Sequence, residues 1–271
     1  MRTALYQLDA FAGSLFRGNP AAVMPMGRFP DDATLQSLAA ENNLAETAFL
    51  VPQGSDYRLR WFTPTTEVAL CGHATLASAT VVMERLEPDR KSVTFHSASG
   101  PLAVVRESTA YVMDFPVRTS APVDTPAELV AALGLTPLEV FADAGNYLVR
   151  LESPRAVRAL TPDFAALARL DRWGVIVTAT GKGHGDGGSR DDDCYDFVSR
   201  YFAPAKGIPE DPVTGSAHCA LAHYWAPRLD KTDFLAHQAS KRGGDVTCRL
   251  RGDRVQLEGR CVFYLEGQVE F

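Results

Sequence analysis

The sequence predicts a mixed α/β (α+β) protein built from two similar halves. The main observation is a motif that occurs twice: Phe62-Thr63-Pro64 precedes Cys71-Gly72-His73-Ala74, and Phe202-Ala203-Pro204 precedes Thr214-Gly215-Ser216-Ala217. In both copies, Phe-x-Pro ends an apolar run typical of a strand, and a polar loop leads to a glycine that opens a stretch of small residues. Two unrelated strand–loop–helix junctions would give the same pattern, so the motif alone leaves duplication as one of two interpretations.

The first half combines short strands with two helices. A helix is expected over 31–39, with aspartates at its start, where the helix dipole favours negative charge. The stretch 74–83 is rich in small apolar residues and has little polar surface, which indicates a buried helix. Strands are expected over 4–11, in the segment that follows Gly18-Asn19-Pro20, and over 48–51, 57–62, 93–95, 102–106 and 111–115.

The second half shows a similar order of elements. Its segment 141–149, which contains the Gly145-Asn146 pair, echoes the Gly18-Asn19 turn near the start of the chain. A second buried helix is expected over 217–225, and the segment 116–126, rich in Pro, Ser and Thr, is the expected linker. The first half is therefore placed at 1–116, with the C-terminal strand 259–271 as a candidate addition, and the second half at 117–258. Its other expected elements are a helix over 163–170 and strands over 174–180, 195–202, 246–250, 254–257 and 261–265.

Composition narrows the class of protein. The 271 residues carry a net charge of −6, which argues against a nucleic-acid partner. No apolar run approaches the roughly 18 residues of a spanning helix, and the N-terminus lacks the pattern of a signal peptide, so no membrane partner is expected. The five cysteines are odd in number and form no C-x-x-C pair, which indicates reduced thiols in a cytoplasmic protein.

One glycine-rich segment imitates a nucleotide loop. Gly183-His184-Gly185-Asp186-Gly187-Gly188 matches G-x-G-x-x-G, but such a loop must open a helix and attract a phosphate. Here Asp191-Asp192-Asp193 follow and would repel it. No nucleotide site is therefore predicted, and no metal site either, because clustered loop carboxylates are usually solvated.

Three residues of the first half are candidates for proton chemistry. Glu46 precedes an apolar run, and partly apolar surroundings can raise a carboxyl pKa into the range of a general acid/base; an exposed loop glutamate is the alternative. His73 begins the buried helix, where it could donate to a substrate or shuttle a proton, or merely cap and pack. Cys71 lies where a helix N-terminus can lower a thiol pKa, although a lone cysteine is often a small core residue.

The second half offers a cluster suited to anions. Asp211-Pro212 fixes a turn, and Thr214, Gly215 and Ser216 combine hydroxyls with the free backbone N–H groups of a helix start. Threonine and serine also cap helices routinely, so capping is an equal alternative. His218 and Cys219 lie one helical turn deeper and are expected in the core.

Several motifs occur together in the order found in one known family. The chain resembles PhzF-type proteins, the phenazine-biosynthesis isomerase family within the diaminopimelate epimerase-like fold, over nearly its whole length. The strongest match is the segment 210–218, Glu-Asp-Pro-Val-Thr-Gly-Ser-Ala-His, followed by Gln238 and Arg242-Gly243-Gly244. The other matching motifs are Gly18-Asn19-Pro20-Ala21-Ala22-Val23, Asn43-Leu44-Ala45-Glu46-Thr47, Phe62-Thr63-Pro64, Gly72-His73-Ala74-Thr75-Leu76 and Arg200-Tyr201-Phe202-Ala203-Pro204.

This resemblance implies two pseudo-symmetric halves, each a mostly antiparallel, barrel-like sheet around one central helix, with the active site in the cleft between them. It further implies a homodimer, and an isomerase that moves a proton on a small cyclic carboxylate without a metal or an organic cofactor. Glu46 would be the general acid/base. The other implied site residues are His73, Asp211 and Ser216 as catalytic residues, and Cys71, Gly72, Thr214 and Gly215 as substrate-binding residues.

Two other classes of function remain open. One is an amino-acid racemase or epimerase that depends on the Cys71 thiol. The related epimerases use two cysteines, whereas this chain has Thr214 at the pseudo-equivalent place of the second half. The other is a non-catalytic binding protein with the same fold, against which the intact set of implied site residues argues.

Overall fold

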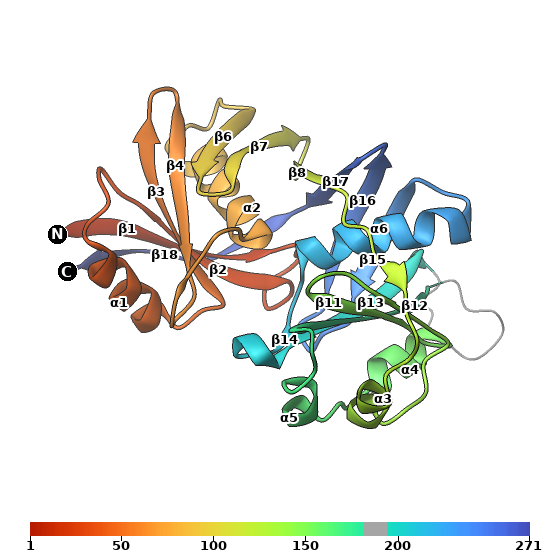
Figure 1. Cartoon of the computed structure of the whole chain (residues 1–271). Helices are drawn as coiled ribbons and strands as arrows, with labels where there is room; N and C mark the ends of the chain where they lie inside the picture. Colours follow the sequence, from red (N-terminus) through yellow and green to blue (C-terminus); the bar gives the residue numbers. More distant parts are fainter. Residues whose placement is uncertain (182–193) are drawn as a thin grey trace. The chain divides into compact units, whose positions relative to one another are not determined.

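The computed structural model describes residues 1–181 and 194–271 and shows a mixed α/β protein that consists mostly of strands (Figure 1). The predicted fold class is confirmed. The chain divides into two compact units, one formed by Met1–Asp114 with Glu258–Phe271 and the other by Phe115–Leu257. The G-x-G-x-x-G match at 183–188 and the three aspartates at 191–193 lie outside the described residues. Within the described ranges, no helix has the length and apolar character needed to cross a membrane.

The first unit is organised around helix α2 (Gly72–Val81), which packs against β1, β2, β3, β6 and β18. Every residue from His73 to Val81 is buried. The hydroxyl groups of the helix are satisfied internally, because those of Thr75, Ser78 and Thr80 donate to backbone carbonyls four residues earlier. The other elements are β1 (Arg2–Ala10), β2 (Asn19–Pro25), α1 (Asp32–Asn42), β3 (Glu46–Gln53), β4 (Asp56–Phe62), β5 (Glu67–Val68), a π-helical turn that continues α2 (Val82–Leu86), β6 (Ser92–Ser97), β7 (Gly100–Glu107), β8 (Ala110–Pro116) and β18 (Cys261–Glu270).

The second unit contains the corresponding long helix, α6 (Gly215–Leu229), which packs against β16. Its predicted core residues His218 and Cys219 are indeed buried. The other elements are β9 (Ala121–Pro122), α3 (Ala127–Leu133), β10 (Glu139–Ala142), β11 (Asn146–Arg150), α4 (Pro154–Ala159), α5 (Phe164–Leu167), β12 (Gly174–Thr180), β13 (Phe197–Ala203), a 3₁₀ turn (Pro204–Lys206), β14 (Ile208–Asp211), β15 (Asp233–Gln238), β16 (Gly244–Arg251) and β17 (Arg254–Gly259).

The two units repeat one order of strand pairing. In the first, β1–β2 is antiparallel, β2–β3 parallel, β3–β4 antiparallel, β4–β6 parallel and β6–β7 antiparallel. In the second, β10–β11, β11–β12, β12–β13, β13–β15 and β15–β16 follow the same alternation. A sequence of five pairings with matching directions identifies the motif repeat as part of a duplicated architecture rather than two unrelated junctions.

Some boundaries differ from those the sequence predicts. The segment 141–149, likened to the Gly-Asn turn of the first half, does hold a turn between β10 and β11, because the Asp143 carboxylate accepts hydrogen bonds from the backbone N–H groups of Gly145 and Asn146. Helix α5 is four residues long where eight were expected, and the expected linker 116–126 contains the short strand β9. Helices α3 and α4 and strand β15 were not predicted.

Candidate active site

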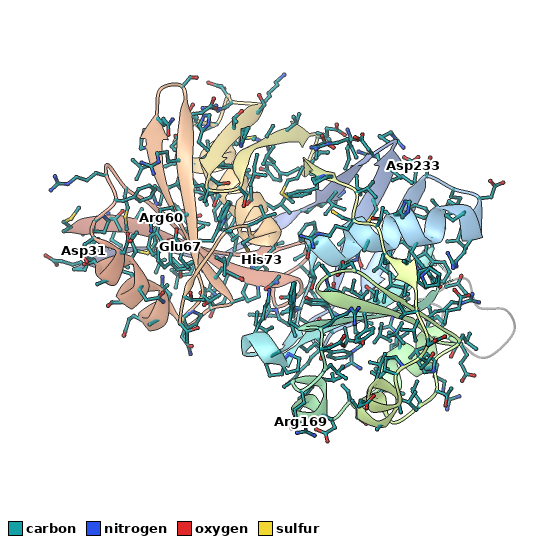
Figure 2. All side chains as sticks on the ribbon, viewed as in Figure 1. Asp31, Arg60, Glu67, His73, Arg169 and Asp233 are labelled. Atoms are coloured by element: carbon teal, nitrogen blue, oxygen red, sulfur yellow. The ribbon has the colours of Figure 1, made fainter. Side chains whose placement is uncertain are left out.

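The first cluster forms where three elements of the first unit begin. Asn19 opens β2, Glu46 opens β3, and Cys71 and His73 flank the first residue of α2 (Figure 2 labels His73). The two strands are parallel, with Ala21 opposite Glu46, so both start at the same edge of the sheet. α2 packs on both strands, and this brings its first turn to the two polar side chains.

His73 is the centre of this cluster. Its Nε2 lies 3.1 Å from Oε2 of Glu46. Its Nδ1 lies 3.1 Å from Nδ2 of Asn19 and 3.5 Å from Sγ of Cys71. The imidazole therefore stands between the carboxylate on one side and the amide and thiol on the other.

The Glu46–His73 pair is shielded from solvent. The side chains are 12% and 6% exposed, respectively. Glu46 Oε2 and His73 Nε2 are close enough for an ion pair, yet neither atom has a hydrogen bond of good geometry within the described residues. A buried carboxylate oxygen and ring nitrogen of this kind can each accept or donate one more hydrogen bond, which a bound ligand could supply.

Burial and charge shift the pKa values of the cluster in a consistent direction. Burial lowers the pKa of His73, but a Cys71 thiolate together with the Glu46 carboxylate would raise it by more, to well above its ordinary value. The contribution of Cys71 requires a thiolate. Burial, followed by the Glu46 charge, raises the pKa of the Cys71 thiol to about 11, so the thiol keeps its proton near neutral pH. The expected activation of this thiol by the helix N-terminus does not occur.

The start of α2 is built without a side-chain cap. Cys71, the N-cap, has extended backbone angles and its side chain makes no capping hydrogen bond. The same holds for Thr214 at the start of α6. Glycine follows in both helices, so neither a cap nor a Cβ at that position covers the first turn, where helix N–H groups favour an anion.

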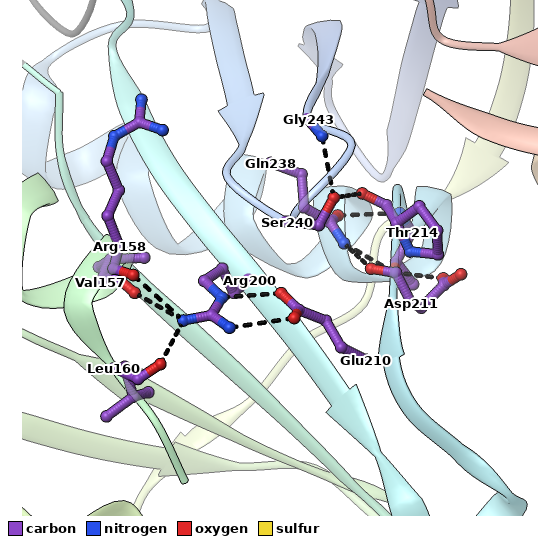
Figure 3. A network of polar contacts seen from close by, with 11 residues as sticks. Val157, Arg158, Leu160, Arg200, Glu210, Asp211, Thr214, Gln238, Ser240 and Gly243 are labelled. Carbon is purple, nitrogen blue, oxygen red and sulfur yellow. Dashed lines mark hydrogen bonds and ion pairs between the residues drawn. The ribbon is translucent and has the colours of Figure 1, made fainter. Parts of the chain in front are cut away.

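The second cluster lies in the second unit, around the turn between β14 and α6. The Thr214 hydroxyl donates to Oδ2 of Asp211 over 2.5 Å. The buried Gln238 holds the same turn: its Oε1 accepts from the Thr214 backbone N–H at 2.8 Å, and its Nε2 donates to the Asp211 carbonyl at 2.7 Å (Figure 3). The hydroxyl of Thr214 is thus engaged within the turn, and Ser216 beside it is exposed.

The guanidinium of Arg200 fixes the strand that leads into this turn. Arg200 on β13 binds both carboxylate oxygens of Glu210, at 2.7 and 3.0 Å, and donates to the carbonyl of Leu160 at 2.6 Å (Figure 3). Ser240 donates to the carbonyl of Pro212 at 2.8 Å. Because a bidentate arginine–carboxylate pair fixes orientation as well as distance, the strand that ends at Asp211 is held in one place.

The structure therefore brings the predicted residues together in two groups. Glu46, Cys71 and His73 meet in the first unit, and Asp211 and Thr214 meet in the second. Asn19 and Gln238 belong to these groups but were not predicted as site residues. The repeated Gly-Asn pair was the available signal for Asn19, whereas nothing local to Gln238 indicates that it binds a turn more than 20 residues earlier.

A single set of potential metal ligands occurs in the described ranges. One atom each of Glu46, Cys71 and His73 lies within 4.8 Å of the others. The carboxylate and the thiol contact opposite nitrogens of the imidazole, however, so these contacts do not converge on one point as a metal ion requires.

The fold and the buried Glu46–His73 pair define a class: a duplicated α/β protein with a carboxylate–imidazole pair in its first unit. The sequence model of the phenazine biosynthesis-like protein family matches residues 8–267. An uncharacterized isomerase of Pseudomonas aeruginosa is 49% identical, with 99% of both chains covered, and a human phenazine biosynthesis-like domain-containing protein is 38% identical over 98% of this chain and 99% of its own. A PhzF-family crystal structure from Enterococcus faecalis superposes with a TM-score of 0.93 at 42% identity and full coverage of both chains.

The chain belongs to the phenazine biosynthesis-like (PhzF) family. Similar bacterial proteins are named isomerases, and the prediction of an enzyme of the isomerase class is confirmed at that level. The fold extends to more distant proteins, since a hydroxyproline epimerase from Agrobacterium vitis superposes with a TM-score of 0.61 at 13% identity, covering 99% of this chain and 92% of its own.

Proposed function

We propose that this protein is an isomerase that moves a proton on a small cyclic carboxylate by general acid/base catalysis, with Glu46 as the acid/base. The observation that carries the proposal is the buried pair of Glu46 Oε2 and His73 Nε2, 3.1 Å apart and without other hydrogen-bond partners in the described part of the chain. Solvent would otherwise exchange with a proton held on Glu46, and burial protects the proton between removal and return.

The chemistry assigns one role to each member of the pair. Glu46 removes a proton from an activated carbon of the substrate and returns it to another carbon of the same ring. His73 faces the carboxylate through Nε2 and stabilises its charged form. No step requires a thiolate or a bound group.

Binding of the substrate carboxylate is assigned to the uncapped helix starts. The backbone N–H groups near Gly72 and Gly215 and the hydroxyl of Ser216 are suitable donors. Asp211 would orient a polar group of the ring, since its carboxylate is held by Thr214. This assignment treats both units as contributors to one substrate site in the cleft between them. The homodimer and the cytoplasmic location are part of the same proposal. The distant hydroxyproline epimerase was crystallised with trans-4-hydroxy-L-proline, a small cyclic carboxylate, which fits this class of ligand.

The thiol-dependent racemase is the weaker alternative. A racemase of that kind needs a thiolate, and the pKa of Cys71 is raised to about 11. Its second thiol is absent as well, because Thr214 occupies the corresponding helix start and its hydroxyl is bound to Asp211. The binding-protein alternative differs from the proposal only in lacking turnover.

The test is Glu46→Gln, assayed by the exchange of carbon-bound hydrogen for deuterium in D2O across a panel of small cyclic carboxylic acids. A positioned general base contributes about 10²–10⁴ in rate, so the variant should lose that factor while its ligand affinity stays within a few fold. Affinity is measured by calorimetry with 3-hydroxyanthranilate as the first ligand. Equal exchange in the variant excludes the role of Glu46, and binding without exchange in the wild type favours the binding protein.

A further inference from the structure

The Nδ1 atom of His73 has two neighbours that can both donate a hydrogen bond. Asn19 presents its amide nitrogen at 3.1 Å, and an amide nitrogen has hydrogens but no lone pair to accept with. Cys71 presents its sulfur at 3.5 Å, and its thiol is protonated at neutral pH because its pKa is about 11. All three residues are buried. A nitrogen faced by two donors is best satisfied when it carries no hydrogen itself.

We propose that Asn19 and Cys71 are positioning residues that keep Nδ1 of His73 unprotonated, so that the single proton of the ring lies on Nε2, on the side of Glu46. Asn19 is thereby assigned to the site, and Cys71 acts through its S–H group rather than as a nucleophile or base. The catalytic meaning of this arrangement rests on the proposed function, but the position of the proton does not depend on turnover.

Two influences compete at this ring. Charges on Cys71 and Glu46 together would raise the pKa of His73 by more than burial lowers it, but a thiol with a pKa of about 11 carries no charge near neutral pH. Glu46 alone then favours a second proton on the ring, and burial, the largest single influence, opposes it. A proton on Nδ1 would also point at the hydrogens of Asn19 and Cys71, and both donors would lose their acceptor inside the protein. Hydrogen bonds that are made to the neutral form disfavour the charged form, so the two donors shift the balance towards a neutral ring.

The second unit supplies a contrast and an internal reference. Asn146, which opens β11 as Asn19 opens β2, accepts a hydrogen bond from Tyr201 at 3.0 Å, and its amide nitrogen donates to the Asp143 carboxylate at 3.3 Å. His218 places Nδ1 2.8 Å from the carbonyl oxygen of Thr214. A carbonyl only accepts, so the proton of His218 must lie on Nδ1, and its pKa near 4 keeps the ring neutral. The two buried histidines are therefore expected to be opposite tautomers.

The experiment is long-range ¹H–¹⁵N correlation NMR of the unliganded, histidine-labelled protein near pH 7. The His73 signals are identified by their loss in His73→Gln. We expect His73 to show an unprotonated Nδ1 and a protonated Nε2, and His218 to show the reverse. Protonation of Nδ1 in wild-type His73, either as the other tautomer or as the imidazolium, overturns the proposal.

Substitutions test the contributions of the Asn19 amide and the Cys71 thiol one at a time. Asn19→Asp replaces the donor by an acceptor of the same size and should place a proton on Nδ1, while Asn146→Ala, the control from the other unit, should leave the His73 signals unchanged. If Asn19→Asp does not fold, the variants Cys71→Ala and Cys71→Ser test the proposal instead. Cys71→Ala removes a donor and should raise the pH midpoint for protonation of His73 Nδ1 by about one pH unit, a tenfold change in proton affinity. Cys71→Ser restores a donor and should return the midpoint to the wild-type value.

Failure of this positioning proposal is distinguishable from failure of the proposed function. An unchanged midpoint in Cys71→Ala, or a serine variant that behaves like alanine, removes Cys71 from the positioning role even if Glu46→Gln abolishes exchange. Conversely, the opposite-tautomer spectrum stands by itself if no carboxylic acid is turned over.

Discussion

The starts of α2 and α6 have the same construction and different chemistry. Cys71-Gly72-His73-Ala74-Thr75 aligns with Thr214-Gly215-Ser216-Ala217-His218. At the last position, the Thr75 hydroxyl donates to the Cys71 carbonyl at 2.6 Å, and the His218 ring lies 2.8 Å from the Thr214 carbonyl through Nδ1. Two unlike side chains thus satisfy the same backbone oxygen, which shows that the helix start is conserved in geometry between the units while its residues are not.

The strand beside each helix shows the same divergence. Two residues after Asn19, Ala21 lies opposite Glu46 in the parallel pair; two residues after Asn146, Leu148 lies opposite Ile176. The place taken by a carboxylate in the first unit is thus taken by a buried isoleucine in the second. The buried carboxylate–imidazole pair therefore belongs to the first unit alone among the described residues, and the second unit offers hydroxyls and the Asp211 carboxylate on a fixed turn.

The largest expected effect concerns that fixed turn. Gln238→Leu should lower the free energy of unfolding by about 4 kcal/mol, because the buried Thr214 N–H and the partly buried Asp211 carbonyl lose their partner at roughly 1–3 kcal/mol each. Urea denaturation of the wild type and the variant measures this loss of stability. Gln36→Leu is the control, since Gln36 makes one partly buried bond, to the Thr63 carbonyl, and should cost less. A loss no larger than the control's would mean that Gln238 does not hold the turn.

The second prediction uses the two residues that bind the N-cap carbonyls. Burial lowers the pKa of His218 from 6.5 to about 4. Between these values the unfolded chain binds a proton that the folded chain does not, so stability should fall as pH drops from 6.5 to 4, by about 3 kcal/mol in total. His218→Thr, which installs the residue type of the first unit, should remove this pH dependence although it lowers stability throughout. His223→Gln at an exposed position should retain the wild-type slope, and a slope that persists in His218→Thr contradicts the assignment.

A smaller effect is expected at Gly174, beside the asparagine of the second unit. A Cβ there would lie 2.1 Å from Oδ1 of Asn146 and 2.4 Å from the hydroxyl of Tyr201. Gly174→Ala should therefore displace the Tyr201–Asn146 hydrogen bond and cost about 2 kcal/mol in thermal or urea unfolding. Gly27→Ala is the matched control, because nothing lies within 4 Å of its added Cβ. Equal stability of the two variants would show that this asparagine is not tightly packed.

Local pattern was sufficient for some of this architecture and not for the rest. The small-residue stretches and the glycines that precede them predicted α2 and α6, because burial on all sides leaves no polar face. Helices α3 and α4 are too short to show a helical period, so their existence depends on tertiary packing. The contact between Glu46 and His73 depends on the packing of α2 against β3, which no local pattern near either residue specifies. The motif resemblance named both residues but gave no information on Asn19 as their partner.

The smallest expected effect is on Cys71 itself, where the comparison with Thr214 is most direct. Cys71→Ala should reduce deuterium exchange by less than the 10²–10⁴-fold expected for loss of the general base, because the thiol acts on His73 and not on the substrate. A thiol-dependent racemase would instead lose all turnover. Iodoacetamide labelling followed by mass spectrometry provides the control: exposed Cys194 should react first at pH 7.5, and buried Cys71, with its pKa of about 11, should react far more slowly. Rapid modification of Cys71 together with complete loss of exchange would reverse the assignment and make the thiol, rather than Glu46, the reactive group of the first unit.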